Sequence, residues 1–352
     1  MKKLLLATSA LVALAGGASA EVAVTGDGRM GLVYDGDSAQ FSSRARAKFN
    51  LTGETDSGLS FGGAFRVDEE NYSANPEGRS AAHGTDGYVF ISGSFGKLSM
   101  GDVVSASEAA IGDLPELGYT AGEFAADPEE IDYLTGDGQN EEQGPTALYE
   151  YTISGVKLFA SLSDGSRRNC DATIGSEDCY DFADDDADVS DMAYSLAAAY
   201  EFGAYNVGLG YAKWGDASEI VLGGTAAIDA FKIKAFYAMY DDRDVGGPDS
   251  DLNNDDEDFG DFDLPLGSNY DKSYGVSVEY AMSNGIGLQA LWMTREIDLP
   301  AAAGDFEESY DAYGIGASYE LGTGVTLAGA IIKNELFAEN ETRADMGVKF
   351  SF

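Results

Sequence analysis

The sequence is poor in cysteine, histidine and long apolar runs, and each shortage excludes a class of protein. No apolar run of about 18 residues, the length that a transmembrane helix needs, follows residue 20, which excludes a helical membrane protein. The two cysteines, Cys170 and Cys179, have no histidine near them in the chain, so they supply too few ligands for a structural zinc site. The single histidine, His83, is the only residue around which a Ser-His-Asp triad could form.

Basic residues are also scarce. The chain has 21 Lys and Arg against 62 Asp and Glu, which gives a formal net charge of −41. A surface this acidic repels a phosphate backbone, so nucleic acid is not an expected partner. The imbalance is strongest between Lys97 and Lys157, where the chain has no basic residue at all.

Residues 1–20 have the pattern of a secretory signal peptide. Lys2 and Lys3 precede an apolar run, and Ala18-Ser19-Ala20 matches a cleavage site. We therefore expect a mature chain over residues 21–352. Because an exported chain passes through an oxidising compartment, we expect Cys170 and Cys179 to form a disulfide, with two free thiols as the alternative.

The abundant feature of this chain is alternation with period two. In 22–32 the even positions are mostly apolar, and in 41–51 Arg44, Arg46 and Lys48 alternate with apolar residues. This pattern is typical of strands exposed to two different media. Sixteen such segments have about the length that crosses a bilayer at a tilt. They are 22–32, 41–51, 59–68, 85–95, 96–106, 145–154, 155–163, 191–202, 204–214, 218–228, 230–240, 270–281, 285–297, 308–320, 324–335 and 342–352.

The connections between these segments alternate in length. Short turns such as Ser154-Gly155 and Asn284-Gly285 are followed by long polar links such as 164–190 and 241–269. Short turns at one rim and long loops at the other are typical of an outer-membrane barrel with an even strand number, whereas a soluble β-sandwich gives no reason for them. We therefore predict an all-β fold, a transmembrane 16-stranded antiparallel β-barrel.

The long acidic link 107–144 is predicted to fold into the barrel lumen as a constriction loop, opposite arginines on the wall. Loops of this length inside a compact domain are uncommon and usually functional. An exposed acidic cap is the alternative. The carboxylates expected at the constriction are Glu108, Asp113, Glu116, Glu123, Asp127, Glu129 and Asp132.

Several motifs resemble the general diffusion porins of purple and related alphaproteobacteria. The similarity is strongest in the first third of the chain, and it continues to the C-terminus. The motifs are TGDGRMGLVYDGD (25–37), FSSRARAKF (41–49), TDSGLSFG (55–62), VFISGSFGKLSMGDVVSASEA (89–109), GDLPELGYT (112–120), YLTGD (133–137), VGLGYAKW (207–214) and GVKFSF (347–352).

This resemblance implies a homotrimer of sixteen-stranded barrels in which the third loop forms the constriction. It also implies an arginine cluster on the opposite wall, which maps onto Arg29, Arg44, Arg46 and Arg66. The C-terminal Phe352 matches the family's signal for the barrel-assembly machinery. The loop with Cys170 and Cys179 and the Asp-rich run 241–263 lie outside the recognised pattern.

These observations lead us to expect a passive pore for small hydrophilic solutes and ions in the outer membrane, with a weak to moderate preference for cations. Carboxylates on the loop and guanidiniums on the wall set up a transverse field in which polar solutes align. A plugged structural or adhesive barrel is the alternative. An outer-membrane hydrolase is a further alternative, and it would need a nucleophile near His83. We expect His83 to lie in a solvated loop.

No cofactor is required for this function. Asp249, Asp251 and Asn253 have the spacing that opens a calcium loop, but Asn254 replaces the required Gly and the distal Glu is missing. Weak Ca²⁺ binding at Asp249 and Asp251, bridging neighbouring loops or lipopolysaccharide, is therefore a secondary hypothesis. Solvation and repulsion of anions are the simpler interpretation of these acidic runs.

Overall fold

A computed structural model of the protein describes residues 19–72, 87–125, 127–136, 146–163, 165, 192–245, 267–300, 307–335 and 342–352. The predictions for the signal sequence, His83, Cys170, Cys179, Asp249 and Asp251 concern residues outside these ranges, except that Ser19 and Ala20 begin the first strand.

The described residues form sixteen strands and two short helical turns. The number of strands and the antiparallel barrel are as predicted. The strands are β1 (Ser19–Tyr34), β2 (Ala39–Glu54), β3 (Ser60–Tyr72), β4 (Tyr88–Gly93), β5 (Gly96–Gly101), β6 (Thr146–Ile153), β7 (Val156–Ser163), β8 (Ala193–Phe202), β9 (Tyr205–Trp214), β10 (Ala217–Ile228), β11 (Phe231–Asp241), β12 (Asn269–Ala281), β13 (Ile286–Asp298), β14 (Glu307–Gly322), β15 (Val325–Asn334) and β16 (Thr342–Ser351). The helices are α1 (Ala106–Ile111) and the 3₁₀ turn η2 (Glu123–Ala125). No helix in the described part is long and apolar enough to cross a membrane.

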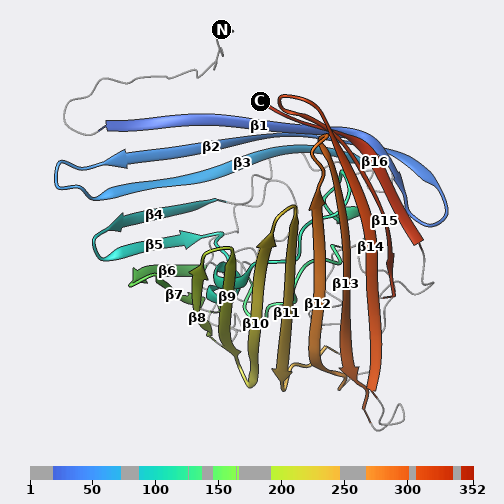
Figure 1. Ribbon diagram of the computed structural model, residues 1–352. Helices are drawn as coiled ribbons and strands as arrows, with labels where there is room; N and C mark the ends of the chain where they lie inside the picture. Colours follow the sequence, from blue (N-terminus) through green and yellow to red (C-terminus); the bar gives the residue numbers. More distant parts are fainter. Residues whose placement is uncertain are drawn as a thin grey trace, which may run out of the picture.

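Each strand pairs antiparallel with its neighbours in sequence, and β1 pairs with β16 to close the barrel (Figure 1). The closing register runs from Asp27 opposite Ser351 to Tyr34 opposite Ala344. Closure matters energetically because every strand then has a partner on both sides. Along the paired registers the backbone N–H and C=O groups bond to a neighbouring strand, which avoids the cost of an open sheet edge in lipid.

The turns alternate in length as predicted. At one rim the connections are as short as the two residues Ser154 and Gly155 between β6 and β7, both with positive φ. A two-residue hairpin of type I′ needs positive φ at both central positions, which explains the Gly at the second. At the other rim the connections include 102–145 between β5 and β6 and 242–268 between β11 and β12.

The two faces of the barrel wall differ in chemistry. Large apolar side chains are exposed on its outer face, among them Val24, Phe41 and Ile315 with 59%, 82% and 64% of their surface accessible. On the inner face of the same strands lie polar and charged side chains such as Arg29 and Arg44. An apolar outer surface of this extent would be unfavourable in water and is suited to contact with lipid.

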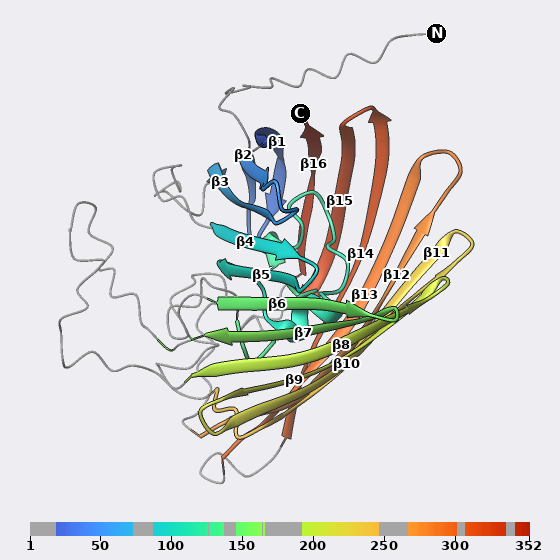
Figure 2. The same ribbon diagram turned by 90° about the vertical axis from the view of Figure 1, so that its left-hand side faces the viewer.

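The connection between β5 and β6 enters the barrel, where Figure 2 shows it (teal) between opposite walls. It begins earlier than predicted, because the strand expected over 96–106 ends at Gly101. The cause is local: Ser105 caps α1, and its hydroxyl accepts from the backbone N–H of Glu108 at 3.2 Å. A capped helix start satisfies an N–H group that would otherwise lack a partner, so the chain leaves the strand conformation here.

Glycines on the inner face of the wall make room for α1. A Cβ atom on Gly223 of β10 would lie 2.3 Å from Cγ2 of Ile111, and one on Gly210 of β9 would lie 2.5 Å from Oγ of Ser107. At these distances, no side chain could be added at either glycine unless α1 or the strand moved. The helix therefore packs directly against the backbone of these strands. Its residues Ala106 and Ala110 form an apolar cluster with Val103, Leu148, Phe159, Ala197 and Ala199.

We predict that Gly223→Val destabilises the protein by about 1–3 kcal/mol, because an overpacked contact must push α1 away from β10. The measurement is the unfolding midpoint in urea of the refolded protein in detergent. Ala226→Val, which places the same final side chain on the outward-facing side of the same strand, is the control and should change the midpoint little. Equal midpoints for the two variants would contradict the packing described here.

Candidate functional site: a charged constriction in the barrel lumen

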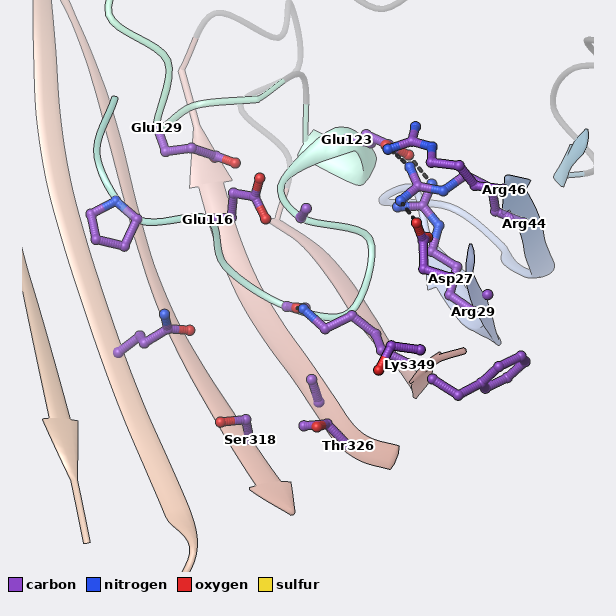
Figure 3. Close-up of a pocket in the computed structure, with 18 of the residues that line it drawn as sticks. Asp27, Arg29, Arg44, Arg46, Glu116, Glu123, Glu129, Ser318, Thr326 and Lys349 are labelled. Atoms are coloured by element: carbon purple, nitrogen blue, oxygen red, sulfur yellow. Dashed lines mark hydrogen bonds and ion pairs between the residues drawn. The ribbon is translucent and has the colours of Figure 1, made fainter. Parts of the chain in front are cut away.

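A cavity of about 1150 Å³ lies in the lumen beside the inward-folded connection, which we call the loop (residues 102–125 and 127–136). Figure 3 shows the arginines of β1 and β2 on one side of it and Glu116 and Glu129 of the loop away from them, whereas Glu123 of the loop lies beside the arginines. Its charged lining residues are Asp27, Arg29, Arg44, Arg46, Arg66, Asp113, Glu116, Glu123, Asp127, Glu129, Glu130, Glu279, Glu320 and Lys349.

The basic wall is built by register. Arg29 of β1 lies directly opposite Arg44 of β2 in the ladder, so both side chains point to the lumen side. Arg44 also lies 3.5 Å from a carboxylate oxygen of Asp27. The four predicted arginines, Arg29, Arg44, Arg46 and Arg66, all line the same cavity, as their alternating positions in the sequence require.

The loop touches this wall through Glu123. Its carboxylate accepts from Nη1 of Arg44 at 2.8 Å and forms an ion pair with Arg29 (Figure 3). Arg29 also donates from Nη1 to the carbonyl oxygen of Thr120 at 2.7 Å. The expectation that loop and wall charges face each other across water therefore does not hold for Glu123, which contacts both guanidiniums directly.

The other acidic loop residues of the cavity lie away from that contact. Glu116 is exposed. Glu129 is only 2% exposed, and its carboxylate packs against the backbone of Gly122, whose φ is +97°. Burial, together with the nearby charge of Asp127, raises the pKa of Glu129 to about 9. Glu129 is therefore protonated at neutral pH. Burial also raises the pKa of Asp113, although the backbone N–H of Ile131 donates to its carboxylate at 2.9 Å.

Asp132 has a different position from the one predicted. It is not at the constriction but bound to the wall, where its carboxylate accepts from Nε of Arg295 at 2.7 Å and from the hydroxyl of Tyr270 at 2.6 Å. Its carbonyl oxygen accepts from Arg243 and Tyr240. Burial would raise the pKa of Asp132, but the guanidinium of Arg295 holds this pKa below its usual value. Asp132 is therefore a charged anchor of the loop.

A second anchor, Asp345 of β16, was not recognised from the sequence. Its carboxylate accepts from the backbone N–H groups of Tyr119 and Thr120 at 2.9 and 2.8 Å, and from the hydroxyl of Thr120 at 2.7 Å. It also accepts from Ala330 on the neighbouring strand. The available signal was a lone carboxylate at an inward-facing position of the last strand. Alternation indicates that this side chain faces the lumen, but it does not indicate which segment of the loop binds it.

Glu108 lies in α1, half-buried and outside the cavity lining. Within the described residues, no three His, Cys, Asp or Glu side chains are grouped so that they could hold a metal ion. The calcium hypothesis for Asp249 and Asp251 lies outside those residues.

Comparisons with known proteins agree with this architecture. The sequence model described as Gram-negative porin matches residues 7–336. The chain belongs to the Gram-negative porins. It is 38% identical to the porin of Rhodobacter capsulatus and 29% identical to that of Fuscovulum blasticum, in each case over 94% of this chain and all of the relative.

Solved porin structures share the fold. A porin structure refined at 1.8 Å resolution superposes with a TM-score of 0.71 at 34% identity, over 94% of this chain and all of that one. A mutant of Rhodopseudomonas blastica porin gives a TM-score of 0.61 at 22% identity over the same shares of the two chains, which supports the fold alone. Porins are channels, so the hydrolase alternative around His83 has no support from the family.

We predict that Asp132→Asn detaches this end of the loop, because it leaves the buried charge of Arg295 uncompensated. Removal of one partner of a buried ion pair costs about 3–5 kcal/mol. The porin should unfold at lower urea concentration, and its single-channel current should fluctuate more. In the double variant Asp132→Leu/Arg295→Met both charges are absent, so we expect it to regain most of the stability. If the double variant were no more stable than Asp132→Asn, the pair would not be the anchor.

We also predict a pH effect of Glu129 on stability. The folded porin keeps the proton up to a pH of about 9, whereas the unfolded chain releases it near the ordinary value of 4.5. Folding is therefore increasingly disfavoured by this residue as the pH rises from about 4.5 to 9. Glu129→Gln should match the wild type at pH 4 and be more stable at pH 7 and 9, as measured by urea midpoints. A constant difference at all three pH values would show that Glu129 is ionised.

Proposed function

We propose that this porin is a water-filled pore of the outer membrane for passive passage of small hydrophilic solutes and ions, with a weak to moderate preference for cations. The observation that carries the cation preference is the charge of the cavity lining, which has nine carboxylates against five basic side chains. Even with Glu129 protonated, the acidic groups remain in excess. A lumen lined mostly by one sign of charge concentrates counter-ions of the opposite sign.

The arrangement of these charges also favours polar solutes over apolar ones. The basic groups Arg46 and Lys349 and the acidic group Glu116 lie on different sides of the same cavity (Figure 3). Water between them is oriented, and an apolar solute must displace it without replacing its hydrogen bonds. Arginine suits the wall because it stays charged at any working pH.

The plugged barrel remains as the rival function. The cavity of about 1150 Å³ beside the loop supports the open pore, since a plug formed by this loop alone would fill it.

The family resemblance extends the proposal to partners. We propose a homotrimer in contact with outer-membrane lipid and lipopolysaccharide, with cleavage after Ala20 and a Cys170–Cys179 disulfide. Phe352 is proposed as the contact for the barrel-assembly machinery. Its backbone N–H donates to the carbonyl oxygen of Gly26 at 2.8 Å, while the residue as a whole is 80% exposed. This leaves the ring accessible to a partner after the barrel has closed.

The test is ion conductance of the refolded mature protein in a planar bilayer, with the reversal potential measured under a potassium chloride gradient. We expect large, stable steps in groups of three and a reversal potential of cation-selective sign. Anion selectivity would contradict the proposed excess of carboxylates but keep the pore. A folded barrel without conductance would favour the plugged structure.

A further inference from the structure

Arg29 and Arg44 together form a site for an anion. Their side chains lie opposite each other on neighbouring strands and are only 3% and 12% exposed. Two guanidiniums that converge on one point bind a carboxylate or a phosphate more strongly than a single cation does, because each donates charge-assisted hydrogen bonds. Without an anion between them, two buried like charges this close would also repel each other.

Glu123 already occupies this site. One of its carboxylate oxygens is paired with Arg29 and the other with Arg44. The side chain is 38% exposed on its cavity side, so it is reached from the lumen. A carboxylate of the protein therefore sits where an anion passing through the pore would bind.

The backbone around Glu123 is held in place from several strands. Asn334 donates to the carbonyl oxygen of Ala125 at 3.2 Å, and Arg343 donates to that of Phe124 at 3.3 Å. Upstream, Asp345 binds the N–H groups of Tyr119 and Thr120. Arg29 and Arg44 take no part in these three contacts, so the turn η2 presents Glu123 to the Arg29–Arg44 pair as part of the folded loop.

We propose that Glu123 is a specificity-determining residue of the pore, an internal anion that occupies the Arg29–Arg44 site and prevents this arginine pair from attracting permeating anions. The ligand class of the unoccupied site is a small oxyanion, such as inorganic phosphate or a carboxylate. This inference rests on the proposed pore function and assigns its charge preference mainly to one contact.

The inference separates Glu123 from the other acidic residues of the cavity. Glu116 lines the same cavity, is exposed, and forms no ion pair within the described part of the chain. Loss of its charge removes one unit of negative potential and nothing else. Loss of the charge of Glu123 removes the same unit and also removes the carboxylate that bridges Arg29 and Arg44, although Asp27 stays 3.5 Å from Arg44. The two substitutions therefore form a matched pair.

The experiment compares wild type, Glu116→Gln and Glu123→Gln in planar bilayers. From reversal potentials in potassium chloride, we expect the ratio of potassium to chloride permeability to fall less than about twofold in Glu116→Gln and by about fivefold or more in Glu123→Gln. Inorganic phosphate added to one side should reduce the chloride current of Glu123→Gln only. The double variant Glu123→Gln/Arg44→Gln lacks one guanidinium and should lose this inhibition.

Equal shifts in the two single variants, or the same response to phosphate in all three proteins, would overturn the inference while leaving the pore intact. Absence of conductance in the wild type would instead contradict the proposed function. If Glu123→Gln fails to fold, Glu123→Asp serves in its place. Its shorter side chain withdraws the carboxylate from the arginines, so the permeability ratio should fall in the same direction by a smaller factor. An unchanged ratio in Glu123→Asp would overturn the inference too.

Discussion

The position of the loop depends on buried charges that the barrel wall presents to it. Asp345 on β16 and Arg295 on β13 would each be costly without a partner, since a buried charge loses its hydration. The loop supplies both partners, two backbone N–H groups at Tyr119 and Thr120 and the carboxylate of Asp132. Apolar contacts of Leu114, Leu117 and Phe124 with the wall add to this anchoring. The barrel therefore determines where the constriction lies.

The acidic residues of the loop are divided among three physical states by their surroundings. Asp132 is ionised and paired with a wall arginine, Glu129 is buried near other carboxylates and holds its proton, and Glu116 faces the cavity. Carboxyl side chains of one loop thus serve as a charged anchor, as a neutral buried group and as a charge that lines the pore. A count of carboxylates in the sequence overstates the charge that a permeating ion meets.

The strands and their connections could be predicted from the sequence because both depend on local patterns. Alternation along one strand determines which side chains face the lumen, and it placed Arg44 and Arg46 on the polar face of their strand. The pairing of the loop with the wall could not be predicted, because Asp345 and Thr120 are separated by 225 residues and meet only after the barrel closes. The glycines at 210 and 223 carried a usable signal, since glycine inside a strand often marks a close approach of another segment.

The contact of Glu123 with Arg29 and Arg44 joins two requirements that evolution could otherwise adjust separately. The arginines are almost fully buried and need a nearby negative charge to be stable there. A permeating anion could supply that charge only while it is bound, whereas the loop supplies it permanently. The same carboxylate that stabilises the wall therefore reduces its attraction for anions. A relative with a stronger anion preference would need another way to hold its arginine pair, such as greater exposure to water or a polar neighbour in place of the glutamate.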